Sequence, residues 1–128
     1  MQIEKRAEFD EILEKIIASL PDYVREQLRE IPVIVEDEPS AEILREMGEE
    51  EEEESDLCGL HTGIPLSDRS PSFNAMVPNV IHLFRGPISR LAGNNLKKLE
   101  REIRITLLHE IGHHFGFSEE KLESMGYG

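Results

Sequence analysis

The chain has 128 residues, of which 38% are hydrophobic and 32% are charged, and its formal net charge is -13. This length suits one compact domain over residues 1–128 with a core of its own, so neither a disulfide nor a metal is needed merely to fold. The acidity, with no stripe of Lys and Arg along the chain, argues against nucleic acid as a partner.

The N-terminal third of the sequence predicts two helices and a strand. Apolar residues recur at spacings of three and four over residues 3–20, which is typical of a helix with one buried face. We interpret this face as core packing rather than as a partner-binding surface. Pro21 interrupts the pattern, and a second short helix is expected over residues 23–31. Residues 31–36 contain three β-branched residues in a row and predict a strand.

An acidic segment follows in the middle of the chain. Ser40 can cap a short helix that ends near Met47. Seven of the nine residues 48–56 are acidic, and because like charges repel and nothing there can be buried, we expect a solvated, flexible loop. These acids lie far in sequence from the chemistry described below, so we interpret them as saying little about a substrate.

The C-terminal half predicts two more strands and a long helix. Strands are expected over residues 57–61 and 80–85, with a loop rich in Pro, Ser and Asp between them. A Gly-Pro pair ends the second of these strands. Asn94 or Asn95 can cap a long amphipathic helix, and Gly116 is a natural C-terminal stop for it.

Cysteine content and hydropathy indicate the compartment. The single cysteine, Cys58, excludes an internal disulfide framework and suits a reducing environment. No apolar run approaches the roughly 18 residues of a membrane span, and the N-terminus lacks the apolar stretch of a secretory signal. We therefore expect a cytoplasmic protein with no membrane partner.

The long helix contains the sequence H-E-x-x-H, formed by His109, Glu110 and His113. Two histidines four residues apart on a helix point the same way, so both imidazoles can reach one zinc ion at about 2.0–2.1 Å. Glu110 lies beside such an ion without being a ligand, which suits a general base that takes a proton from zinc-bound water. The competing interpretation, ordinary surface residues of a helix, is disfavoured because the match falls on a predicted amphipathic helix near a glycine stop.

A catalytic zinc site needs a third protein ligand. Gly116 can turn the chain back sharply, and this brings Glu119, three residues later, towards the metal. Glu120, Glu123 or no protein ligand at all remain alternatives. Ser118 could also cap a final helix, whose first turn favours acidic residues.

The sequence around the H-E-x-x-H motif resembles that of the small bacterial zincin-like metallopeptidases, or minimal zincins. Their pattern is HEIGHHFG followed three residues later by Asp. Residues 109–116 read HEIGHHFG, and the similarity extends to residues 59–66 (GLHTGIPL) and 81–88 (IHLFRGPI), spanning most of residues 30–128. Glu119 stands where Asp is usual, and His61 stands where Tyr is common.

The resemblance implies an α/β (α+β) fold: a single zincin-like domain with a small twisted mixed β-sheet packed on helices. It also implies that the long C-terminal helix carries the metal ligands, that zinc is the cofactor, and that the substrate is a peptide or protein.

Other residues have less specific roles. Tyr127 could pack under the metal or offer a hydroxyl to the reacting group, although a tyrosine that seals the core is the simpler interpretation. His114 points about 100° away from its neighbouring ligand, so we expect it to pack beside the ligands or contact one of them. His82 is expected at a solvent-facing strand position, and Cys58 as a small buried hydrophobe.

The sequence therefore predicts a zinc-dependent metallopeptidase in which Glu110 activates the attacking water. One alternative is a catalytically silent metal-binding or regulatory protein with the same frame. Another is a zinc-dependent ribonuclease like those that process ribosomal RNA, which have three histidines and a glycine after the first; Glu110, Glu119 and the acidity argue against it. So short a chain would draw specificity from a partner, from an oligomer such as a homodimer, or from an open cleft.

Overall fold

The computed structural model describes residues 1–48, 55–63, 79–124 and 126. Three strands form a mixed sheet in the order β1-β3-β2. Strand β1 (Val33–Glu36) runs parallel to the central strand β3 (Val80–Phe84), and β2 (Gly59–Thr62) runs antiparallel to it. Among the described residues, β1 and β2 are therefore the two edges of the sheet.

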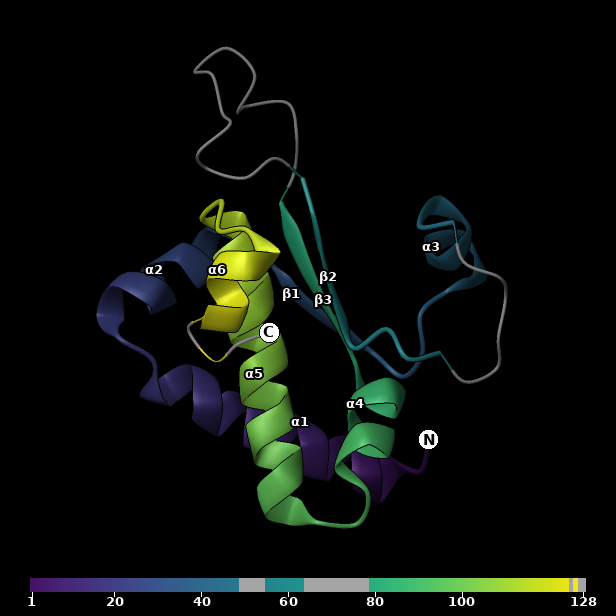
Figure 1. The fold of residues 1–128 in the computed structure, drawn as a ribbon. Coiled ribbons are helices and arrows are strands. Elements are labelled where there is room, and N and C mark those ends of the chain that lie inside the picture. Colours follow the sequence, from purple (N-terminus) through teal and green to yellow (C-terminus); the bar gives the residue numbers. More distant parts are fainter. Residues whose placement is uncertain (49–54, 64–78, 125, 127–128) are drawn as a thin grey trace.

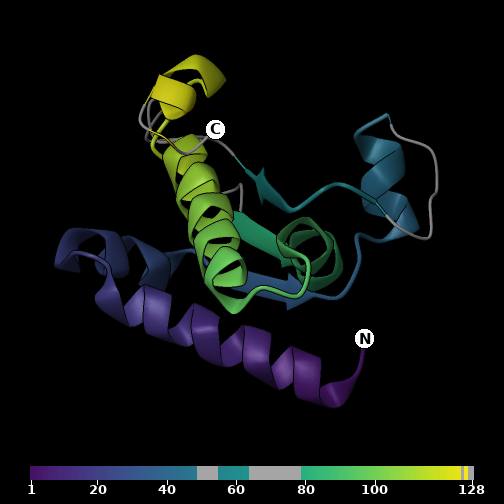
Figure 2. The same ribbon diagram turned by 60° about the horizontal axis from the view of Figure 1, so that its bottom comes forward.

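The described ranges also contain six helices. They are α1 (Ile3–Ser19), α2 (Asp22–Glu30), α3 (Ala41–Glu46), α4 (Arg85–Ala92), α5 (Leu96–His114) and α6 (Glu119–Ser124). The long helix α5 contacts both β2 and β3, and α6 lies over its C-terminal end (Figure 1). Helix α1 packs against α5 and runs beneath it in Figure 2. The predicted α+β arrangement, a small mixed sheet packed on helices that include a long C-terminal one, is confirmed.

The hydrophobic core lies between α1, α5 and the sheet. The apolar stripe of α1 is buried here, as its spacing predicts, and α5 and β3 supply the facing side chains. The most deeply buried members are Phe9, Ile16, Ile81, Leu83, Ile88, Ile103 and Leu107. No helix of the described residues is both long enough and apolar enough to cross a membrane.

Side-chain caps begin two of the helices where the sequence predicts them. The Ser40 hydroxyl accepts a hydrogen bond from the backbone N–H of Ile43 at 3.1 Å, and the side-chain Oδ1 of Asn95 accepts one from the backbone N–H of Lys98 at 3.1 Å. Gly116 follows the end of α5 with φ at 90°, a conformation that glycine adopts without steric cost. Both ends of α5 are therefore encoded locally.

Helix α4 has no counterpart among the predicted elements. The Gly-Pro pair does end β3, but a helix begins at once at Arg85. Pro87 lies in the first turn, where its missing N–H would have no partner within the helix. A Cβ atom at Gly86 would lie 2.8 Å from the backbone oxygen of Asp37, so only glycine fits there. The pair therefore begins a helix instead of a loop.

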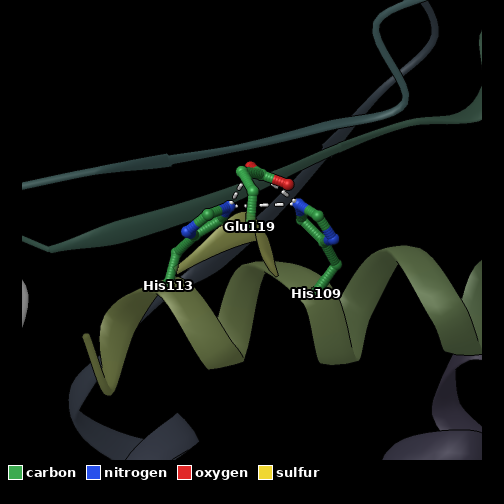
Figure 3. A group of neighbouring side chains, drawn as sticks. All are labelled: His109, His113 and Glu119. Carbon is green, nitrogen blue, oxygen red and sulfur yellow. Dashed lines mark hydrogen bonds and ion pairs between the residues drawn. The ribbon is translucent and has the colours of Figure 1, made fainter. Parts of the chain in front are cut away.

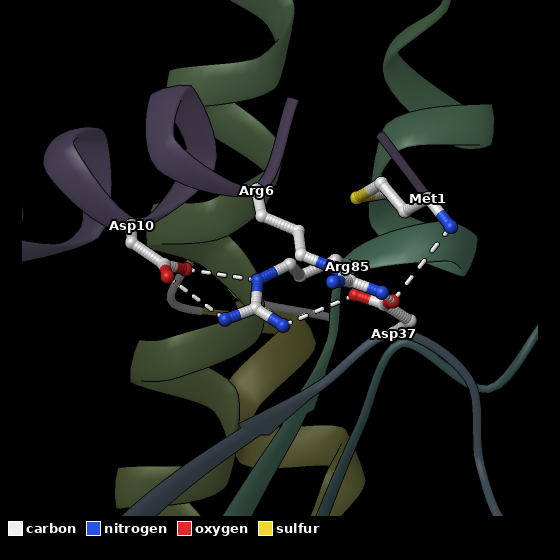
Figure 4. A network of polar contacts seen from close by, with 5 residues as sticks. All are labelled: Met1, Arg6, Asp10, Asp37 and Arg85. Carbon is white, nitrogen blue, oxygen red and sulfur yellow. Dashed lines mark hydrogen bonds and ion pairs between the residues drawn. The ribbon is translucent and has the colours of Figure 1, made fainter. Parts of the chain in front are cut away.

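A network of charged side chains ties α1 to the sheet (Figure 4). Arg85 donates two hydrogen bonds to Asp10 of α1, at 2.9 and 2.8 Å, and one to Asp37, just after β1, at 3.1 Å. Arg6 donates to Asp37 at 2.9 Å, and the amino group of Met1 lies 3.7 Å from the same carboxylate. The hydrogen bond from Arg6, supported by Arg85, lowers the pKa of Asp37 below its usual value although partial burial opposes this.

Candidate metal centre

Two histidines lie one turn apart near the end of α5. His109 and His113 present their Nε2 atoms to the same point, 3.0 Å from each other, with the rings edge to face (Figure 3). This is the convergence that a spacing of four residues on a helix dictates.

The chain then reverses and brings a carboxylate to the same point. The backbone N–H of Phe117 bonds to the carbonyl of Gly112 at 2.9 Å, which closes the turn around Gly116. Ser118 caps α6, because its hydroxyl accepts the N–H of Lys121 at 3.1 Å. Glu119, the first residue of α6, is placed over the end of α5 as a result.

Glu119 approaches both histidines (Figure 3). Its Oε1 atom lies 2.7 Å from Nε2 of His113 and 3.3 Å from Nε2 of His109. The side chain of Glu119 is 66% exposed, so the group opens to solvent on the α6 side. Glu120 and Glu123, the alternatives considered as third ligand, are not part of this group.

Gly112 allows α6 to lie this close to α5. A Cβ atom at Gly112 would lie 2.3 Å from Cδ2 of Leu122, a residue of α6 that is almost fully buried. Leu122 therefore packs directly on the backbone of α5 at Gly112, the residue before His113. The glycine inside the H-E-x-x-H sequence thus has a packing reason of its own.

The three donor atoms fit a single metal ion. Neighbouring ligands of a tetrahedral zinc ion at about 2.0–2.1 Å are separated by about 3.3–3.4 Å. The donors of His109, His113 and Glu119 lie 2.7–3.3 Å apart, so a small outward movement would give that spacing. Two imidazole nitrogens with one carboxylate oxygen also form a donor set that zinc takes in hydrolases. These residues can therefore hold a metal ion, and zinc suits them.

Glu110 is buried and lines the same cleft as this group. The residue is only 7% exposed, and burial raises the pKa of its carboxyl above the usual value. His109 and His113 oppose that shift by attraction, Glu119 adds to it by repulsion, and a hydrogen bond from the backbone N–H of His61 lowers the pKa. The carboxyl is thus a buried base with one directional donor.

A cleft of about 490 Å³ runs between the end of α5, α6 and the edge strand β2. It is lined by Met47, Leu57, Gly59, Leu60, His61, Gly63, His109, Glu110, His113, Gly116, Phe117 and Glu119. Met47 and Leu57 flank the acidic segment in sequence, so this segment begins and ends beside the cleft. Residues 49–54 of the predicted acidic loop lie outside the described residues.

Two residues of β2 lie against Glu110, and the sequence motifs assign them no role. A Cβ atom at Gly59 would lie 2.7 Å from Cγ2 of Thr106 and 3.2 Å from Cγ of Glu110, so the strand passes α5 at a distance that only glycine allows. His61 donates its backbone N–H to Glu110. The stretch GLHTG marks both residues as part of a motif, but only the pairing of β2 with β3 brings them to α5.

The other candidate residues from the sequence are His114, His82, Cys58 and Tyr127. His114 is 1% exposed, with its ring edge to face against that of His61. His82, expected to face solvent, is instead only 15% exposed and stacks on Phe84. Cys58 packs against the core, and burial raises the pKa of its thiol to about 11, so the thiol is protonated near neutral pH. Tyr127 lies outside the described residues.

Comparison with known proteins agrees with this arrangement. The model of a family described as zincin-like metallopeptidases matches residues 28–128, a region that includes the whole sheet, α5 and α6. No curated protein sequence matches the chain significantly. Helix α1 and most of α2 precede the matched region. The match covers most of the sequence and contains all three converging side chains, and the chain therefore belongs to the zincin-like metallopeptidase family.

Proposed function

We propose that this protein is a zinc-dependent metallopeptidase that hydrolyses peptide bonds in the cleft beside β2. The observation that carries this proposal is the convergence of His109, His113 and Glu119 on one point, with the buried carboxyl of Glu110 next to it. Membership of the family supports a peptide or protein substrate. His109, His113 and Glu119 are the proposed zinc ligands.

Zinc bound to these residues would lower the pKa of a water molecule and polarise the carbonyl of the peptide bond. Glu110 is the proposed general base. Because burial raises its pKa, its carboxylate is a stronger base than that of an exposed glutamate. It would take the proton of the attacking water and then pass it to the departing amine.

The edge of β2 supports binding of an extended peptide. The N–H of Phe84 bonds to the carbonyl of Cys58, so this opposed pair is a hydrogen-bonded one. Pairs alternate along an antiparallel ladder, and the backbone groups of Gly59 therefore point away from β3, towards the side of β2 where the described residues place no strand. A substrate strand could pair there, which places its peptide bond in the cleft.

Replacement of the base is the sharpest test. Glu110→Gln keeps the size of the side chain and leaves the three ligands in place, so it should bind zinc as wild type does and lose peptide hydrolysis by at least about a hundredfold. Metal content is measured by elemental analysis, and cleavage by mass spectrometry of a peptide library. Glu123→Gln, the same change at an exposed position of α6, serves as the control.

The outcome separates the alternatives. Full activity of Glu110→Gln would show that another group is the base. One zinc per chain with no cleavage of any peptide by wild type would support the silent metal-binding protein instead. His113→Ala should lose the metal, and a chain that takes up no metal even when zinc is supplied would contradict both functions.

A further inference from the structure

His61 has contacts on two sides that the proposed mechanism does not use. It lies on β2 in the wall of the cleft, and its backbone and its ring approach α5 separately. The backbone meets the proposed base, and the ring meets the residue next to a proposed ligand.

The direction of the His61 amide follows from the strand register. His61 lies opposite Ile81, one position from the opposed pair formed by Leu60 and His82. Hydrogen-bonded pairs alternate with non-bonded pairs in an antiparallel ladder, and Cys58 with Phe84 is a bonded pair, so His61 belongs to a non-bonded one. Its N–H therefore points away from β3, and the carboxyl of Glu110 accepts a hydrogen bond from it.

The ring of His61 is held between two elements. Its Nε2 atom lies 3.0 Å from Oδ1 of Asn79, the residue just before β3. Its centroid lies 5.7 Å from that of His114, at an interplanar angle of 67°. His114 is buried in α5, and its Nε2 atom lies 3.4 Å from Oε1 of Gln27 on α2. Two polar contacts, joined by the ring contact between His114 and His61, thus connect α2 through α5 to the edge of the sheet.

The distance between β2 and α5 decides where Glu110 points. Within the described residues β2 pairs with one strand only, and it also contacts α5, so these contacts help to fix its position. Gly59 permits the close approach and cannot set it, because it has no side chain to stop the strand. The ring of His61 packs edge to face against His114, which is 1% exposed in the close-packed interior, so this contact can set that distance.

We propose that His61 is a positioning residue for Glu110. Its amide holds one carboxylate oxygen and leaves the other for water, and its ring keeps that amide at the right distance from α5. The proposal rests on the role of Glu110 proposed above. A displacement of about 1 Å at a reacting group can cost about a hundredfold in rate, so the contact matters although His61 touches no reacting atom.

The hydrogen bond itself can be tested by NMR on the zinc-loaded, 15N-labelled protein, whether or not a substrate is known. Glu110→Gln replaces a charged acceptor with a neutral one, so the amide proton of His61 should move upfield more than any other amide of β2. Glu123→Gln, as the control, should leave it in place. An unmoved His61 amide in Glu110→Gln would overturn the proposal even in an active enzyme.

Kinetics test the role of the ring. His61→Ala keeps the amide but removes the contact with His114, and we expect kcat to fall about 10–100-fold with little change in KM or in zinc content. His61→Phe keeps a ring at this position and should recover most of kcat. Thr62→Ala trims the next residue of the same strand, outside the cleft lining, and should resemble wild type.

These variants separate the proposal from its alternatives. A loss in His61→Ala no larger than that in Thr62→Ala would overturn the positioning role. An equal loss in His61→Phe and His61→Ala would also overturn it, because the ring contact would then not be what matters. A wild-type protein without peptidase activity would contradict the proposed function, and the NMR shift would still decide the position of Glu110.

Discussion

Glycine at position 59 permits the close approach between β2 and the helix that carries the proposed ligands. A methyl group there would press on Thr106 and on the side chain of Glu110, which lie one turn apart on α5. The contact with Thr106 affects packing, whereas the contact with Glu110 affects the proposed base. A single substitution at position 59 can therefore test both the packing of β2 on α5 and the position of the proposed base.

Gly59→Ala should lower stability and activity for these two separate reasons. Overpacking of this kind costs about 1–3 kcal/mol, measured as the free energy of unfolding in urea. Displacement of Glu110 should lower kcat by more than about tenfold while the zinc content stays unchanged. Thr106→Ser removes the methyl group that the new Cβ would strike at 2.7 Å, so the double variant should regain stability without regaining kcat. Recovery of both would show that Glu110 is not displaced.

The site residues differ in how far the sequence alone could predict them. His109, Glu110 and His113 follow from helical periodicity, which is a local rule, and Glu119 follows from the turn that Gly116 permits. Gly59 and His61 reach Glu110 only because β2 pairs with β3 and both lie on α5. Positions 61 and 110 are joined by register and packing, for which the sequence contains no local signal.

At the scale of the elements, local rules predict where a helix begins and ends better than they predict which elements pair or pack together. Ser40 and Asn95 cap helices because a side-chain oxygen satisfies the first free N–H groups. The Gly-Pro pair in the first turn of α4 is compatible both with the end of a strand and with the start of a helix, and only the approach of Asp37 to Gly86 explains the outcome. The strand order β1-β3-β2 likewise depends on pairing between distant segments.

Helix α1, which precedes the region matched by the family, is joined to the sheet by Asp37. Because Arg6 and Arg85 lower the pKa of Asp37, the folded chain binds a proton there less readily than the unfolded chain does. The contacts therefore stabilise the fold fully above the ordinary aspartate pKa of 3.8, and this stabilisation is lost as the pH falls through the lowered value.

Asp37→Asn should accordingly destabilise the protein in a pH-dependent way. At pH 7 we expect a loss of about 1.5–3 kcal/mol in the free energy of unfolding, the range for hydrogen bonds to charged groups. The gap between variant and wild type should narrow below about pH 4, because wild-type Asp37 then becomes protonated itself. Glu14→Gln, the same kind of change at an exposed position of α1, should stay within about 0.5 kcal/mol. A gap that is constant from pH 3 to pH 7 would contradict the ionic role.

At the scale of the whole molecule, distance along the chain is a poor guide to distance in space. The acidic segment lies about fifty residues before the H-E-x-x-H sequence, yet Met47 and Leu57, on either side of it, both line the cleft. Its separation from the chemistry in sequence therefore gives no reason to ignore its charge when substrates are chosen. Peptides used in the assays should span both signs of charge for this reason.

The proposed metal would also join parts of the fold that are otherwise weakly connected. Glu119 comes from α6, a helix of six residues whose Leu122 packs on α5 at Gly112. A ligand set drawn from α5 and α6 would make metal binding part of the folding free energy. A ligand that binds only the folded chain stabilises it by about 2.7 kcal/mol at a concentration of a hundred times its Kd.

Removal of the metal should therefore lower the melting temperature of the whole protein. For a chain of this size, about 2.7 kcal/mol corresponds to a fall of roughly 10 °C, measured by calorimetry with zinc and then with excess EDTA. His113→Ala should melt at one temperature under both conditions, because it lacks a ligand. Glu123→Gln, which keeps all three ligands, should show the full difference. A wild-type melting temperature that EDTA leaves unchanged would mean that His109, His113 and Glu119 do not bind zinc in the folded protein.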